Sequence, residues 1–160
     1  MFFNFLINCL HLADNNVAYI YADWYEGTGA IIGAIVPLLS SLAFVLLFYY
    51  VWSRFKATTT LHWLLMGGLN MLVSFALNLF IGKAFLSNYL NDMHTATNQT
   101  DYYDMYLTVS SWPYTTDLWI FAVNGIIWSA VFYFVLSVIL KTWSPVYNIP
   151  FGKKHKKSNN

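Results

Sequence analysis

The sequence predicts an all-α integral membrane protein with three transmembrane helices, an outer N-terminus and a cytoplasmic C-terminus. Three observations lead to this: overall scarcity of charge, three long uncharged segments, and separation of basic from acidic residues along the chain. Apolar residues make up 58% of the 160 residues and charged residues only 9%, whereas a soluble domain carries about 25% charged residues. A soluble protein of this length could not cover its surface with so few charged residues, and lipid is therefore the expected solvent.

Residues 1–29 form the first expected element, an outer amphipathic segment. Within residues 2–15, four polar residues fall on one stripe at helical spacing: Asn4, Asn8, His11 and Asn15. The stretch is too short to cross a bilayer, so we expect a short helix lying in the outer interface. A frayed apolar tail is the alternative. No basic residue precedes the apolar stretch and no small-residue cleavage site follows it, so a signal peptide is not expected.

Three segments without formal charge are long enough to span: residues 30–52, 61–81 and 118–140. A hydrocarbon core of about 30 Å needs roughly 20 helical residues. Because lipid offers no hydrogen-bond partners, these segments must satisfy their own backbone groups, and helices do so. The chain is thus expected to form a single membrane domain.

The charges predict the orientation. The short loop 53–60 carries Arg54 and Lys56, and the tail 141–160 carries five lysines. All seven acidic residues lie before residue 30 or in the loop 82–117, where the only basic residue is Lys83. Excess Lys and Arg marks the cytoplasmic side of a membrane. An even number of spans would place the tail opposite Arg54 and Lys56, so three spans fit best.

The segment 82–117 is expected to be an outer loop. It is the longest polar region of the chain, but it falls below the about 40 residues at which domains usually need extra staples to fold. Its middle, residues 91–100, is rich in Asn, Thr and Asp and predicts a flexible connection. A catalytic domain outside the membrane is therefore not expected.

Polar residues recur every four positions in the second span: Asn70, Ser74 and Asn78. This spacing puts them on one slowly winding face of a helix. Polar groups facing lipid are costly, so the stripe should face protein or water. Interhelical hydrogen bonding is the favoured interpretation, and a pore lined by amides is the alternative. The hydrogen-bond candidates in the other spans are Asn124 and Ser129, or Ser40 and Ser41.

Small residues suggest a close helix contact at the start of the first span. Gly29 and Gly33 form a small-xxx-small pair, which lets another helix approach. Four residues later, Pro37 cannot donate a hydrogen bond to the Gly33 carbonyl. The partner helix could come from the same chain or from another subunit.

The C-terminal tail contains a cluster of four lysines: Lys153, Lys154, Lys156 and Lys157. Each lysine near an anionic leaflet contributes about 1 kcal/mol of attraction. Anionic lipid headgroups or an acidic partner are the expected contacts. A role in setting topology alone is the alternative.

Catalytic, metal and cofactor sites are not expected. The four histidines are scattered, and no nucleophile has a base partner in a recognisable motif. No Asp, Glu, Lys or Arg lies within a span, which argues against a proton relay. With one cysteine, Cys9, no disulfide can form within the chain. The near-neutral net charge gives no indication of nucleic-acid binding.

The sequence therefore favours a non-enzymatic anchor, scaffold or accessory subunit of a larger assembly in an inner or plasma membrane. Other membrane subunits or further copies of the chain are the expected partners. The alternative is an oligomeric pore or a holin-like effector. In small size, three spans and a polybasic tail the chain resembles phage holins in general shape, although no motif carries that resemblance.

Overall fold

The computed structural model describes residues 24–52, 59–98, 100, 103–104, 106–107 and 116–141. Its elements are η1 (Tyr25–Gly29), α3 (Ala30–Leu46), η2 (Leu47–Val51), α4 (Thr60–Thr97) and α6 (Thr116–Leu140). Three helices are long and apolar enough to cross a membrane, at Gly27–Val51, Thr60–Thr97 and Leu118–Leu140. The prediction of an all-helical fold with three apolar helices is thus confirmed. The expected helix at residues 2–15 and the lysine cluster lie outside the described residues.

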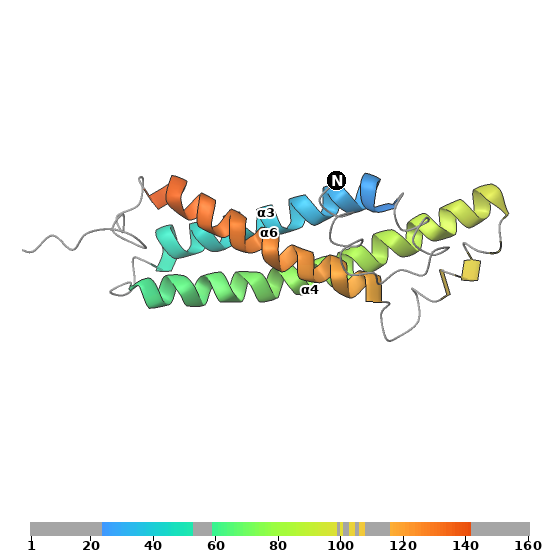
Figure 1. The fold of residues 1–160 in the computed structure, drawn as a ribbon. Helices are drawn as coiled ribbons and strands as arrows, with labels where there is room; N and C mark the ends of the chain where they lie inside the picture. The colour runs from blue at the N-terminus through green and yellow to red at the C-terminus, as the bar shows by residue number, and fades with distance from the viewer. Residues whose placement is uncertain are drawn as a thin grey trace, which may run out of the picture.

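The three helices form an antiparallel bundle. Consecutive helices run in opposite directions, so α3 and α6 are parallel and α4 runs against both (Figure 1). The end of η2, the start of α4 and the end of α6 consequently lie at one end of the bundle (Figure 1). We call this the basic end, because Lys141 follows α6 there, while Trp52 follows η2 and Thr59 precedes α4. The α4 helix extends well beyond the other two at the opposite end, which we call the distal end.

The first apolar helix stays helical through its proline, although the backbone departs from helical geometry at Gly27 near its start. The π-helical turns η1 and η2 flank α3 on either side. Pro37 lies inside α3 and is buried, as is Gly33 one turn earlier. The missing N–H of Pro37 therefore interrupts the hydrogen-bond ladder on the protein-facing side of this helix.

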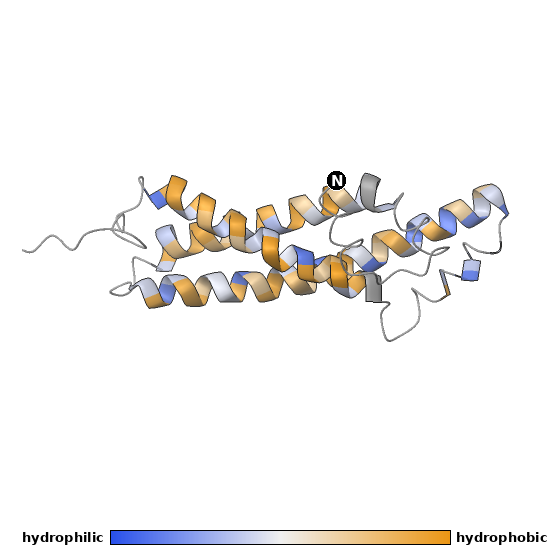
Figure 2. Ribbon diagram, viewed as in Figure 1, coloured by the Kyte–Doolittle hydropathy of each residue, from blue (hydrophilic) through white to orange (hydrophobic). Residues whose placement is uncertain are grey.

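The α4 helix does not end where the apolar stretch ends, contrary to expectation. The segment predicted to begin the outer loop at Gly82 stays helical through Thr97, which includes most of the stretch expected to be flexible. The 38 residues of α4 correspond to a length of about 57 Å. Figure 2 shows that this distal extension is more polar than the rest of the helix.

Packing on one side explains the helical extension. Leu86 and Leu90, four residues apart, are fully buried, and Tyr106 packs against the same apolar cluster. Thr59 caps the start of α4 by accepting from the His62 N–H, and the helix ends at Asn98, whose φ of 53° is left-handed. Hydropathy predicts the length of the apolar part of α4, whereas side-chain packing explains why the helix continues beyond that part.

Two apolar clusters lie at the two ends of the bundle. The distal cluster brings Trp24 against Phe121 with ring centroids 5.4 Å apart. The cluster at the basic end brings Trp63 against Tyr133, also with ring centroids 5.4 Å apart. Between the clusters the helices are joined mainly by polar side chains.

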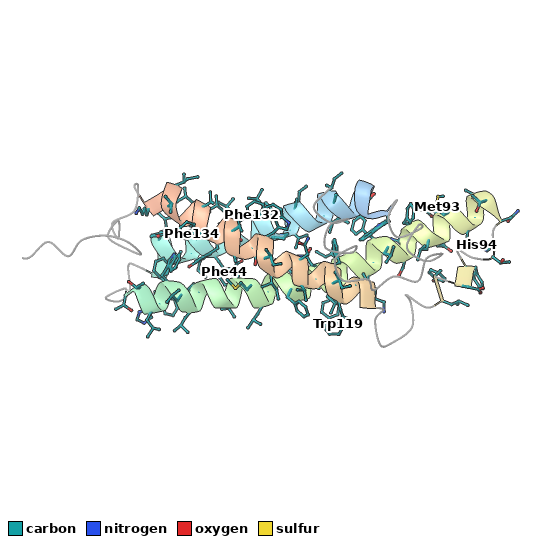
Figure 3. All side chains as sticks on the ribbon, viewed as in Figure 1. Phe44, Met93, His94, Trp119, Phe132 and Phe134 are labelled. Atoms are coloured by element: carbon teal, nitrogen blue, oxygen red, sulfur yellow. The ribbon has the colours of Figure 1, made fainter. Side chains whose placement is uncertain are left out.

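Large apolar side chains cover the outside of the bundle. Leu72 of α4 is 65% exposed, and similar residues line the outer faces of α3 and α6. Figure 3 shows Trp119 projecting from α6 to the side of the bundle. The distribution is the reverse of that in a water-soluble protein, where such side chains are buried.

Candidate interhelical polar site

Polar side chains gather in the interior of the bundle, where all three helices meet. Eight of them are buried: Ser40, Ser41, Asn70, Ser74, Asn78, Asn124, Ser129 and Ser137. They come from α3, α4 and α6. Such groups must find hydrogen-bond partners, because burying them unpaired in an apolar medium costs free energy.

Asn70 connects the three helices. Its Oδ1 accepts from Ser40 Oγ at 2.7 Å. Its Nδ2 donates to Ser41 Oγ at 3.0 Å and to the Ser129 carbonyl at 3.3 Å. Ser41 Oγ in turn donates to the same carbonyl at 3.0 Å. One amide on α4 is thereby bonded to two hydroxyls of α3 and a backbone oxygen of α6.

One turn further along α4, Ser74 and Asn78 form a second contact with α6. Ser74 Oγ donates to the Gly125 carbonyl at 3.2 Å. Asn78 Nδ2 donates back to the Ser74 carbonyl at 2.9 Å. A Cβ placed on Gly125 would lie 2.8 Å from Asn78 Cγ. Gly125 therefore allows the asparagine side chain to pack directly on the α6 backbone.

A third contact lies at the basic end. Trp63 Nε1 donates to Ser137 Oγ at 3.0 Å, and Tyr133 Oη donates to the Trp63 carbonyl at 3.0 Å. The Tyr133 ring lies over Gly67, where a Cβ would approach its Cε1 to 3.0 Å. The two aromatic residues thus join α4 and α6 through hydrogen bonds in both directions.

Sequence reasoning does not identify Trp63, Tyr133 and Ser137 as members of this site. A tryptophan at the end of an apolar segment, such as Trp63, instead indicates an anchor at the membrane interface. A signal is nevertheless present, because Gly125, Ser129, Tyr133 and Ser137 recur every four residues, as do the polar residues of α4. Two such rows on antiparallel helices indicate facing stripes.

The remaining residues of interest have different surroundings. Asn124 is buried in α6 but does not join the Asn70 network. Gly29 is covered by Trp24 of its own segment, whose Cζ3 would lie 2.7 Å from an added Cβ. Gly33 is buried in α3. The four lysines of the tail cluster fall outside the described residues.

The chemistry of the site is neutral. It offers hydroxyls, amides and backbone carbonyls, and all eight buried polar residues are Ser or Asn. Among the described residues there is no group of three or more His, Cys, Asp or Glu that could hold a metal ion. These groups can bind one another or a small polar molecule through hydrogen bonds.

Comparison of this chain with protein-family models, with curated proteins and with solved structures finds no match.

Proposed function

We propose that this chain is an integral membrane protein with three spans that acts as an anchor or scaffold subunit of a larger membrane assembly. The observation that carries the proposal is the inverted distribution of side chains. Polar groups are buried and bonded across the three helices, while large apolar residues cover the outside. The bundle is suited to hold its own shape in lipid and to present an apolar surface to neighbours.

The apolar exterior supports membrane insertion. Ile31, Leu65 and Ile139 belong to three different helices, and each is at least half exposed. Water-soluble monomers rarely expose contiguous apolar patches of more than a few hundred Å². Lipid tails would cover this surface without a free-energy cost, so a bilayer is the simplest environment for it.

The ends of the bundle support an orientation with the N-terminus outside. Lys141, Trp52 and Thr59 lie at the basic end, and the sequence between the last two contains Arg54 and Lys56. Asp92 and Asp104 belong to the distal side. By the positive-inside rule the basic end would face the cytoplasm of an inner or plasma membrane.

Cysteine labelling tests this orientation. In a Cys9→Ser background, Thr95→Cys and Thr60→Cys place single thiols at exposed positions on opposite ends of α4. An impermeant maleimide added to intact cells should label Thr95→Cys, and Thr60→Cys only after permeabilisation. The reverse pattern would overturn the orientation.

The hydrogen-bond network favours a scaffold over a pore. In a pore, Asn70, Ser74 and Asn78 would line water. Here each is fully buried within one chain. The oxygen and the nitrogen of the Asn70 amide are hydrogen-bonded to residues of the other two helices. A channel built from several copies would have to use other residues or open the bundle. The stripe therefore supports a role in holding the helices together.

Affinity purification tests the scaffold proposal. The tagged full-length chain, extracted in mild detergent from native membranes, should co-purify with other membrane subunits or as a homo-oligomer, and untagged cells provide the control. A monodisperse monomer without a co-purifying protein would contradict the proposal. Loss of membrane potential on expression, abolished by Asn70→Leu with Asn78→Leu, would support the pore instead.

A further inference from the structure

Two buried amides near the middle of the bundle have hydrogen-bonding atoms that no described residue satisfies. They are Oδ1 of Asn78 and both Oδ1 and Nδ2 of Asn124. Asn78 is fully buried and Asn124 is 2% exposed, so neither side chain reaches the surface. Amide atoms in such a position need a partner, because their desolvation is otherwise uncompensated.

The two amides lie at the same level of the bundle. Asn78 Cγ packs against Gly125, the residue that follows Asn124 in α6. Asn78 Nδ2 donates to the Ser74 carbonyl, and Ser74 Oγ donates to the Gly125 carbonyl. The Asn78 amide is therefore held beside the backbone that carries Asn124.

The part of α3 in which Pro37 interrupts the helical hydrogen bonds lies at the same level of the bundle as the two amides. Ser41 of α3 donates to the carbonyl of Ser129, which is 88 positions later on the parallel helix α6. The same offset places Asn124 opposite Val36, next to Pro37. Because Pro37 has no N–H, it leaves the Gly33 carbonyl without its usual helical donor. Gly33 and Pro37 are both buried.

We propose that Asn78, Asn124 and the Gly33 carbonyl together bind a water molecule inside the bundle. The ligand must be small, since the amides are enclosed, and uncharged, since no ionisable residue belongs to the buried polar set. It must also both donate and accept, because the site offers three acceptor oxygens and the Asn124 amide donor. Water meets these requirements by donating to two of the oxygens while it accepts from the Asn124 amide, and internal waters typically make about three hydrogen bonds. The bound water connects α6 to α3 where the α3 hydrogen-bond ladder is broken.

Water-edited solid-state NMR of the full chain in lipid bilayers tests the site. Magnetisation transferred from water should appear at short mixing times on the Asn124 side-chain amide and then on the Asn78 amide. Asn70 is the matched internal control, because its amide is bonded to Ser41 and Ser129. The Asn70 amide should receive no magnetisation from water over the same mixing times.

Asn124→Leu provides the second measurement, and it should abolish or strongly reduce the transfer to Asn78. Equal absence of transfer at Asn124 and Asn70 would overturn the proposal, because the Asn124 amide would then be bonded within the protein. Equal transfer to Asn70 would also overturn it, since water would then penetrate the whole interior. Unchanged transfer to Asn78 in the variant would refute it as well, because the two amides would then share no water.

Discussion

Asn70 Oδ1 accepts a hydrogen bond from Ser40 Oγ at 2.7 Å, and this bond joins α4 to α3 in the interior of the bundle. The same amide reaches Ser129 on α6 through its nitrogen. A single side chain thus connects all three helices. In lipid, where the apolar outer surface contributes little to helix association, such bonds and close packing determine how the helices meet.

Asn70→Leu should destabilise the bundle by about 2 kcal/mol, because it removes three hydrogen bonds that average about 0.6 kcal/mol each in membrane proteins. The free energy of unfolding can be measured by titrating mixed micelles with a denaturing detergent. Leu69→Ala is the matched control, since Leu69 is the preceding residue and is 49% exposed on the outer face. Equal effects of the two substitutions would show that the network contributes nothing specific.

Gly125→Ala should destabilise the bundle, whereas Gly68→Ala should not. An added Cβ at Gly125 would meet Asn78 Cγ at 2.8 Å, whereas one at Gly68 would meet nothing within 4 Å. Overpacking at Gly125 should cost about 1–3 kcal/mol. Alanine at Gly68 should leave stability unchanged or raise it by about 0.5–1 kcal/mol through its better helix propensity. Unfolding of both variants under identical conditions checks the contrast, and a Gly125→Ala protein more stable than the Gly68→Ala protein would argue against the close approach.

Trp63 and Ser137 should be energetically coupled. Ser137→Ala removes the acceptor of the Trp63 Nε1 hydrogen bond at the basic end. A double-mutant cycle with Trp63→Phe should give a coupling energy of about 0.6 kcal/mol, with about 1.7 kcal/mol as the upper end. Additive effects of the two substitutions would mean that this bond does not stabilise the bundle. Tyr133→Phe provides a comparison, because the Tyr133 hydroxyl donates to the Trp63 backbone and not to its ring.

The distal extension of α4 should show a helical pattern of accessibility. In the Cys9→Ser background, Leu86→Cys and Leu90→Cys should react slowly with a water-soluble maleimide, because both positions are fully buried. Asn88→Cys and Asn91→Cys should react fast, because these positions are exposed. Labelling kinetics of the four single-cysteine proteins measure this difference. Uniformly fast labelling would indicate the flexible loop that hydropathy alone suggests.

The number and approximate position of the three apolar helices could be predicted from the sequence, because each is an uncharged segment of sufficient length. The end of α4 could not. Residues after Ile81 lose the hydropathy of a span, yet Leu86 and Leu90 are buried by contacts with residues distant in the chain. Such contacts leave only a weak trace in local composition, here two leucines four positions apart.

The candidate site could be predicted in part. The four-residue spacing of Asn70, Ser74 and Asn78 predicts a common face but does not say what that face meets. The partners of the Asn70 nitrogen lie 29 and 59 positions away, too far for local spacing to identify them. Asn124 is a predicted partner for the stripe, yet it joins no hydrogen bond of the Asn70 network.

Local composition and helical periodicity are sufficient to show that three helices prefer an apolar environment and which residues of α4 share a face. They do not show which groups those residues bond, where Gly125 and Gly67 admit a neighbouring side chain, or how far α4 continues. These features emerge only in the packed bundle, because a hydrogen bond or close contact between helices depends on the register of segments far apart in the chain. Register follows from packing all three helices together, and no single segment contains it.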